Sequence, residues 1–346
     1  MKAILFVAAA TTFSVGATAQ SNVTMYGLID MSVNYAHFNA NGTKPSQHLT
    51  TVSNDASRLG FRGSEDLGGG MQAYFKLESG VSLDTGSSTS ATQFFNRESY
   101  VGLGDKSRGW VQLGSQFTPT IWTSGKVDPF ARFGLGAILG ILQGPPRGWA
   151  VTFNNAVQYL TPDFYGLSGK LMVAAGEGAV TGRSYAASAE YTRGPLYLAI
   201  NYDAPKTSAA SVGLTGDAVQ SKTFSAGATY DFGVVKLAGW YQTNRIENLP
   251  NVNGYMAGIT VPAGTGEIRA SYTHRSQLNA DASQSALGYY YFMSKRTWLF
   301  GQIGRLNNSG TAAFGLGPAR LEEAAAGVLN GGRDITGLQL GIRHFF

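Results

Sequence analysis

The sequence of 346 residues contains no cysteine, so disulfide bridges and cysteine-ligated metal sites are excluded. Charged residues make up only 14% of the chain, with 26 Lys and Arg against 21 Asp and Glu. The basic residues are scattered rather than gathered in one segment, which argues against nucleic-acid binding. The four histidines show neither the spacing of a metal site nor that of a nucleophile motif. We therefore expect no enzymatic activity and no cofactor.

Long apolar runs are also lacking, apart from a short one at the amino terminus. Lys2 is followed by an apolar core from Ala3 to Ala10, and Ala17-Thr18-Ala19 has the small-x-small pattern of a cleavage site. A helix that crosses a bilayer needs about 20 apolar residues, so this segment is too short for an anchor. We predict a signal peptide over residues 1–19 and one mature domain over residues 20–346, exported through the periplasm.

The rest of the chain shows a regular alternation of apolar and polar residues. Residues 23–35, 71–78 and 338–343 are examples. A period of two indicates strands with one apolar and one polar face. The predicted strands run to roughly nine to thirteen residues, which is enough to cross a bilayer when tilted. Strands of soluble sandwiches are nearer five or six residues. Strand length therefore favours an all-β fold, a transmembrane antiparallel β-barrel, over a soluble sandwich.

About sixteen strands fit the pattern, and an even number is typical of single-chain bacterial barrels. Tight turns such as residues 66–70 and 231–233 alternate with longer polar stretches such as residues 39–54 and 206–220. This alternation is typical of periplasmic turns and extracellular loops. The strands are expected to begin near Val23, Ser57, Gly70, Phe95, Gly109, Ala150, Gly166, Arg183, Leu196, Ser221, Val234, Val252, Glu267, Ser283, Thr297 and Asp334.

One connection differs from the others. Between Phe117 and Trp149 the alternation stops, yet the segment is rich in Ile, Leu and Phe. An apolar loop exposed to water would be costly. We predict that residues 118–149 fold into the barrel lumen and narrow the channel. The alternative is an outer loop that packs on a neighbouring subunit.

Side-chain charges in a narrow pore decide which ions enter. The predicted constriction residues are Arg58 and Arg62 on the wall and Lys126, Asp128, Arg132 and Arg147 in the loop. The alternation places Asp30, Lys76 and Glu78 on the lumen face. For each of these residues the alternative is a solvated charge with little effect on the current.

Aromatic residues occur near the ends of the predicted strands. They suggest the girdles that barrels place at both membrane interfaces. Examples are Tyr26, Tyr35, Tyr100, Trp110, Tyr159 and Tyr191. Phe346 ends the chain in register with Ile342 and His344, on the apolar face of the last strand. A terminal aromatic residue in this register suits a strand that seals the barrel at the interface.

A set of short motifs covers the predicted mature chain in order. They are Val23-Thr24-Met25-Tyr26-Gly27, Ser57-Arg58-Leu59-Gly60-Phe61-Arg62-Gly63, Glu65-Asp66-Leu67-Gly68-Gly69-Gly70, Asn96-Arg97, Tyr100-Val101-Gly102-Leu103, Tyr230-Asp231-Phe232-Gly233, Ser294-Lys295-Arg296-Thr297 and Gly341-Ile342-Arg343-His344-Phe345-Phe346. Together they resemble the general diffusion porins of Gram-negative bacteria, in particular the beta-proteobacterial type.

The resemblance implies a homotrimer in the outer membrane, in which the third loop of each barrel forms the constriction. It implies wall arginines opposite that loop, and Arg58 matches one of them. Two positions that often carry arginine in the family hold Ser115 and Thr152 here, so we expect only a weak preference for anions. The resemblance also implies that the barrel-assembly machinery reads the terminal strand, for which the candidates are Phe346, His344 and Ile342.

The predicted function is the passive passage of inorganic ions and small hydrophilic solutes through a water-filled channel embedded in outer-membrane lipid. Two alternatives remain at this point. One is a substrate-specific outer-membrane channel, and the other is an adhesive surface barrel with a closed pore.

Overall fold

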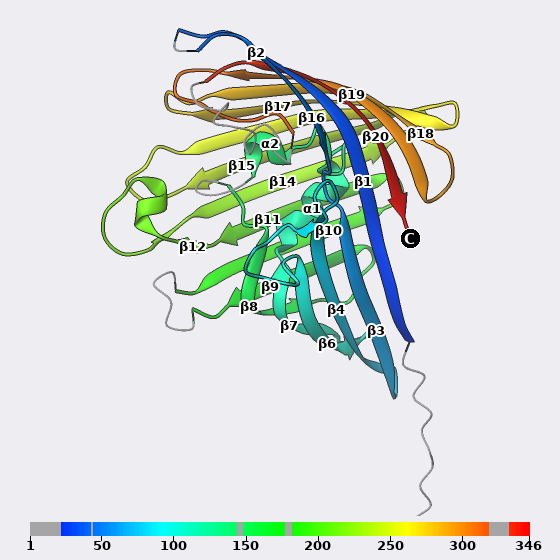
Figure 1. The fold of residues 1–346 in the computed structure, drawn as a ribbon. Helices are drawn as coiled ribbons and strands as arrows, with labels where there is room; N and C mark the ends of the chain where they lie inside the picture. Colours follow the sequence, from blue (N-terminus) through cyan, green and yellow to red (C-terminus); the bar gives the residue numbers. More distant parts are fainter. Residues whose placement is uncertain (1–21, 43, 144–147, 177–181, 318–331) are drawn as a thin grey trace, which may run out of the picture.

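The computed structural model describes residues 22–346 apart from positions 43, 144–147, 177–181 and 318–331. The predicted signal peptide over residues 1–19 and the predicted constriction residue Arg147 lie outside the described residues. Within the described part of the chain, an antiparallel sheet closes on itself as a barrel of sixteen strands. Figure 1 shows the closure, where β1 in blue lies beside β20 in red. The predicted fold class is confirmed.

One barrel strand is interrupted, because β2 pairs with the upper part of β1 and β3 with its lower part. The wall consists of β1 Asn22–Phe38, β2 Gln47–Ser53 with β3 Arg58–Gly68, β4 Met71–Ser82, β6 Glu98–Asp105, β7 Gly109–Phe117, β8 Thr152–Leu160, β9 Leu167–Ala174, β10 Ser184–Arg193, β11 Leu196–Ala204, β14 Lys222–Asp231, β15 Lys236–Arg245, β16 Val252–Ala263, β17 Gly266–Gln277, β18 Ala282–Phe292, β19 Thr297–Asn308 and β20 Ile335–Phe345. The connections also contain β5 Ser87–Ser88, α1 Pro119–Val127, α2 Leu139–Leu142, β12 Lys206–Thr207, η1 Ala209–Val212 and β13 Val219–Gln220.

The predicted strand starts all lie close to observed ones. The largest difference is at Phe95, where β6 begins at Glu98. The prediction of a polar loop over residues 39–54 was wrong in part, because β2 occupies Gln47–Ser53. This segment pairs with β1 beyond the level where β3 begins, and it lacks a regular apolar face. Its sequence therefore carries no period-two signal.

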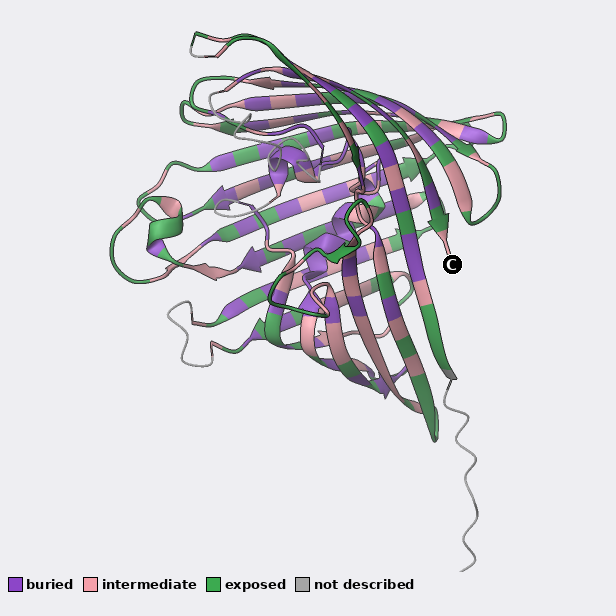
Figure 2. Ribbon diagram, viewed as in Figure 1, coloured by how far each residue is buried: buried purple, intermediate pink, exposed green. Residues whose placement is uncertain are grey.

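The apolar face of the strands points outward. Val23 is 62% exposed and Leu340 57%, whereas the inward-facing Asn244 and Thr273 are fully buried. Figure 2 shows the resulting alternation of exposed and buried residues along the strands. Such an arrangement inverts that of a soluble protein and is typical of a barrel whose outer face meets lipid. Among the described helices, none has the length and apolarity needed to cross a bilayer.

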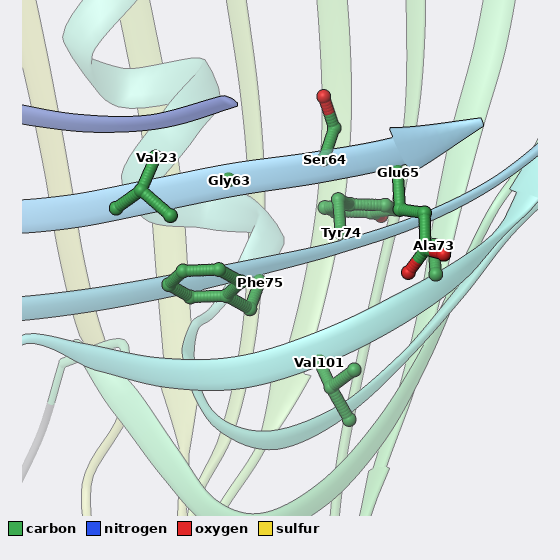
Figure 3. Close-up of a pocket in the computed structure, with 8 residues that line it drawn as sticks. All are labelled: Val23, Gly63, Ser64, Glu65, Ala73, Tyr74, Phe75 and Val101. Carbon is green, nitrogen blue, oxygen red and sulfur yellow. The ribbon is translucent and has the colours of Figure 1, made fainter. Parts of the chain in front are cut away.

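Apolar side chains from neighbouring strands form rows on this outer face. Figure 3 shows Val23, Phe75 and Val101, which lie in one lateral row across β1, β3, β4 and β6. Gly63 lies in the same row and leaves a shallow apolar groove between its neighbours. The row confirms that the odd-numbered positions of this wall face away from the lumen.

The turn between β3 and β4 shows why three glycines occur in succession. Gly68, Gly69 and Gly70 all have positive φ, at 83°, 61° and 85°. This left-handed region is costly for residues that carry a Cβ atom. The predicted tight turn is confirmed.

A buried ion pair lies where the sheet closes. Asp30 of β1 and Arg343 of β20 are direct partners in the ladder, and Arg343 Nε donates a hydrogen bond to Asp30 Oδ2 over 2.5 Å. Both side chains are almost fully buried. The backbone N–H of Asp30 donates to Ser57 Oγ over 2.9 Å, and the Arg343 guanidinium lies 4.3 Å from the ring centre of Phe133. The pair therefore joins the two ends of the barrel to the segment before β3 and to the loop.

Breaking this pair should destabilise the barrel. In Arg343→Leu the Asp30 carboxylate stays buried without its cation, which typically costs about 3–5 kcal/mol. We expect a clear drop in the urea midpoint of unfolding in lipid vesicles, followed by tryptophan fluorescence. The double variant Asp30→Leu/Arg343→Leu removes both charges and should recover most of the loss. Equal midpoints for the single variant and the wild type would contradict a role for the pair in closure.

Candidate pore constriction

The described part of the long connection between β7 and β8 lies inside the barrel. Figure 1 shows α1 and α2 within the ring of strands. α1 contacts β9, β10, β11, β14 and β15, and α2 contacts β17 and β18. Ile121, Ile138, Ile141 and Trp149 are completely or almost completely buried, and Trp149 stacks edge to face on Trp240 of β15. The predicted insertion of the loop is confirmed, and this packing explains the apolar composition of the loop.

Hydrogen bonds fasten α1 to the wall. Thr123 Oγ1 donates to Asn201 Oδ1 over 2.9 Å, and Thr120 Oγ1 donates to Asp203. Lys126 Nζ donates to Glu190 Oε2 of β10 over 2.6 Å. Lys126, a predicted constriction residue, therefore helps to hold the loop, although half of its side chain stays exposed to the lumen.

The segment around α2 is fastened by amides and a hydroxyl from the opposite wall. Gln242 Nε2 donates to the carbonyl of Leu142 over 2.8 Å, and Gln284 Nε2 donates to that of Ala137 over 3.0 Å. Ser271 Oγ donates to another loop carbonyl over 3.1 Å. The Leu142 carbonyl is at the carboxyl end of α2, where the helix offers it no partner, and the other two carbonyls precede the helix. These wall residues supply the hydrogen bonds that water would otherwise provide.

Asp128 organises the tip of the loop. Its carboxylate accepts the backbone N–H groups of Phe130, Arg132 and Ile138 at 2.9, 3.0 and 2.9 Å. Burial raises the pKa of Asp128 to about 6, despite these three donors. The tip also contains two left-handed residues that are not glycine, Ala131 at φ 50° and Arg132 at φ 72°. The prediction that Asp128 presents its charge to the pore was wrong, because its side chain is buried in the turn that it stabilises.

Two buried carboxylates and three cations form a cluster on the wall made by β3, β4 and the start of β6. Arg97 Nε donates to Glu78 Oε1 over 2.7 Å, and Lys76 Nζ lies 3.3 Å from Glu78 Oε2. Arg58 Nε lies 3.9 Å from the same oxygen. Lys76 also pairs with Glu98, which is buried as well. The carboxylates fix the positions of the cations without cancelling their charge.

Arg97 is a site residue that the sequence analysis did not select. Strand alternation assigns odd positions of β6 to the outer face, but Arg97 precedes the first residue of the strand. Its backbone N–H donates to the carbonyl of Glu78, and its guanidinium reaches inward over the ring of Phe117 at 5.2 Å. The Asn96-Arg97 motif was the only signal that pointed to it.

The loop adds Arg132 to this cluster. Burial and the positive charges of Arg97 and Arg58 lower the pKa of Arg132 to about 10, whereas Asp128 acts in the opposite direction. Arg62 lies further along β3, directly opposite Lys76 in the ladder. The five cations of this basic cluster surround two carboxylates, which leaves three net positive charges. The cluster consists of Arg58, Arg62, Lys76, Arg97, Arg132, Glu78 and Glu98.

The structure separates the remaining predicted positions from this cluster. Asp30 faces inward but belongs to the closure pair with Arg343. His344 and Phe346 lie on the outer face, as the register predicted.

Of the six aromatic residues that were expected in the membrane interfaces, three face the lumen instead. Tyr26 donates from its hydroxyl to Glu78 over 2.8 Å, and Trp110 packs edge to face on Tyr74 at 5.2 Å. Tyr100 lies 6.2 Å from the same Tyr74 ring. Their even-numbered positions assign them to the polar face, and the girdle interpretation overlooked this parity.

Comparisons with known proteins agree with this geometry. The model of the Gram-negative porin family matches residues 6–311. Outer membrane porin protein 32 of Delftia acidovorans is 33% identical over the full length of both chains.

Solved structures show the same fold. The anion-selective porin from Comamonas acidovorans superposes with a TM-score of 0.79 at 31% identity, covering 94% of this chain and 100% of that chain. OmpT of Vibrio cholerae in its trimer form has a TM-score of 0.65 at 14% identity, with 94% and 99% covered, which shows likeness of fold alone. On the family match and the full-length likeness to a porin relative, this chain belongs to the Gram-negative porins.

Proposed function

We propose that the chain is a general diffusion porin of the outer membrane with a weak preference for anions. The observation that carries the proposal is the basic cluster, which keeps three net positive charges beside the inserted loop. Low-dielectric walls focus the field of such charges and raise the local concentration of counter-ions. The relative from Comamonas acidovorans is described as anion-selective, and the likeness to it spans nearly the whole chain.

The basic cluster keeps its positive charge although Ser115 and Thr152 stand where the family often has arginine. Ser115 donates to Asn154 over 2.7 Å at a bulge between β7 and β8 and contributes no charge. Arg97, just before β6, and Arg132, in the loop, supply positive charge instead. We infer that residues 118–149 form the constriction and that Arg58, Arg97 and Arg132 line its basic side.

The family and the fold point to a channel rather than an enzyme. No group of three or more histidine, aspartate or glutamate side chains suited to a metal ion occurs among the described residues. Passive passage of ions and small hydrophilic solutes requires neither a cofactor nor an energy source.

We also propose that the mature protein, residues 20–346, assembles as a homotrimer in outer-membrane lipid. The trimer form of the Vibrio cholerae protein, which shares the fold, supports this proposal. The exposed apolar rows of the outer face suit contact with lipid or with another subunit.

Removal of charge from the basic cluster should reduce the preference for anions. In planar bilayers under a KCl gradient, we expect wild-type channels to reverse on the anion side. Arg97→Gln should lower the ratio of chloride to potassium permeability by about two- to fivefold, as one charge at several ångströms in a watery pore contributes on the order of 1 kcal/mol.

Arg108→Gln is the matched control for this measurement. Arg108 lies on a short turn, its side chain is 77% exposed, and the charge change is the same. We expect the reversal potential of this variant to stay at the wild-type value. A wild-type channel that reverses on the cation side, or equal shifts in both variants, would contradict the role of the cluster.

The burial of Asp128 predicts a pH dependence of loop packing. Because its pKa in the folded loop lies above the model-peptide value, the protonated form is favoured in the packed loop, and packing weakens as the pH rises through about 6. Open-channel noise of the wild type should therefore be lower at pH 5 than at pH 7.5. Asp128→Asn, which is neutral at both values, should show no such difference. A pH dependence that persists in Asp128→Asn would assign it to another group.

We propose that Phe346, with His344 and Ile342, forms the signal that the barrel-assembly machinery reads. The backbone of Phe346 pairs with Gly27 through two hydrogen bonds of 3.2 Å, and its ring lies over that glycine. Phe346→Ala should slow folding into vesicles that contain the machinery several-fold, while spontaneous folding into detergent micelles stays near the wild-type rate. Equal slowing in both systems would make Phe346 a structural residue only.

A further inference from the structure

An open recess of about 460 Å³ lies in the lumen wall on the short-turn side of the basic cluster. It is lined by residues of β1, β3, β4 and β6, and three of them are tyrosines: Tyr26, Tyr74 and Tyr100. Its volume falls within the range of small-molecule sites, roughly 300–1,000 Å³. We call it the tyrosine recess.

The two tyrosines at its edges lie flat against the wall. A Cβ atom at Gly60 would come within 2.5 Å of the Tyr26 ring, and one at Gly102 within 2.4 Å of the Tyr74 ring. The two glycines thus create the space in which each ring covers the neighbouring strand. Each ring thus lies on the backbone of the neighbouring strand. Arg62 and Lys76 lie over the Tyr26 ring, at 5.1 and 5.9 Å from its centre.

Hydrogen bonds hold both rings in place. The Tyr26 hydroxyl donates to Glu78 Oε2 over 2.8 Å, and Gln112 Nε2 donates to the Tyr74 hydroxyl over 2.8 Å. With the hydroxyls engaged, the parts of these tyrosines left to contact a passing solute are the rings themselves. Rings held in this way bind with little further loss of conformational entropy.

The ladder places two cations between these rings. Arg62 and Lys76 are direct partners across β3 and β4, and Tyr100 is the partner of Lys76 across β6. Lys76 is already paired with Glu78 and Glu98. Arg62 forms no ion pair among the described residues and lies 5.1 Å from the Tyr26 ring centre.

Arg62 is thus a cation that is free to bind a carboxylate. Its planar guanidinium can hold both carboxylate oxygens at once. Like charges directly opposite in a ladder are destabilising, so an anion bound between Arg62 and Lys76 would relieve their repulsion.

We propose that the tyrosine recess is a weak binding site for small aromatic carboxylates, with the carboxylate on Arg62 and the ring against Tyr26 and Tyr74. This inference rests on the proposed function, since the solute reaches the recess through an open channel. Aromatic pairs contribute roughly 0.5–1.5 kcal/mol beyond area burial, which corresponds to about two- to tenfold in affinity. The site therefore separates aromatic from aliphatic acids of similar size and charge.

The test uses single trimers of the mature protein in planar bilayers in KCl at pH 7. Potassium benzoate, potassium cyclohexanecarboxylate or potassium acetate is added to the short-turn side. We expect saturable block by benzoate with half-block in the range of about 1–100 mM. Half-block by cyclohexanecarboxylate should need two- to tenfold more, and acetate should give no saturable block.

Two substitutions locate the site. Arg62→Gln should weaken block by benzoate and by cyclohexanecarboxylate alike, and Arg108→Gln should weaken neither. Tyr74→Leu should abolish the difference between the two acids. If Tyr74→Leu does not fold, Tyr26→Leu tests the loss of the other aromatic contact.

Equal block by the two ring acids in the wild type, or an aromatic preference that survives both tyrosine substitutions, would overturn the inference. The KCl conductance would be intact in those cases, so the proposed porin function would stand. Absence of any conductance from folded trimers would instead overturn the proposed function.

Discussion

The rest of this structure depends on one constraint: the polar groups of the backbone must form hydrogen bonds within a closed wall. In lipid no water is available to the backbone, so every strand must pair on both sides and the sheet must close. Closure turns one face of each strand toward lipid and the other toward the lumen. The lumen face of the wall carries amides and hydroxyls. Those of Gln242, Ser271 and Gln284 donate hydrogen bonds to carbonyls of the apolar loop between β7 and β8. Closure and loop insertion are thus two results of one requirement.

Period-two alternation made most of the fold predictable. Strand starts, turn positions and the outward face all follow from side-chain parity, because a one-residue shift would turn apolar residues toward the lumen. The prediction failed in segments where odd and even positions do not point to two fixed faces. β2 extends past its neighbour and lacks a regular apolar face, and α1 and α2 lie in a loop that is rich in apolar residues but shows no alternation.

The charged site was predictable only in part, for a related reason. Arg58, Lys76 and Glu78 lie on regular strands, so their inward orientation follows from position. Arg97 lies just before a strand, and Asp128 lies in a turn, where the backbone and not parity decides the direction of the side chain. The parity of Tyr26 was available, but a general expectation about aromatic residues at membrane interfaces outweighed it. The sequence alone does not show which cations surround which carboxylates, because this depends on how strands that are distant in sequence pair.

The inserted loop is tied to the wall at points spread around the barrel. Its first helix is bonded to β10 and β11, and its tip contacts Arg343 of the closing strand. Its second helix accepts from β15, and the residues just before that helix accept from β17 and β18. A segment fixed at such separated points acts as an internal brace. The cross-section of the wall and the bore of the channel are then one mechanical system, in which a change in the roundness of the barrel alters the aperture without any hinge in the loop.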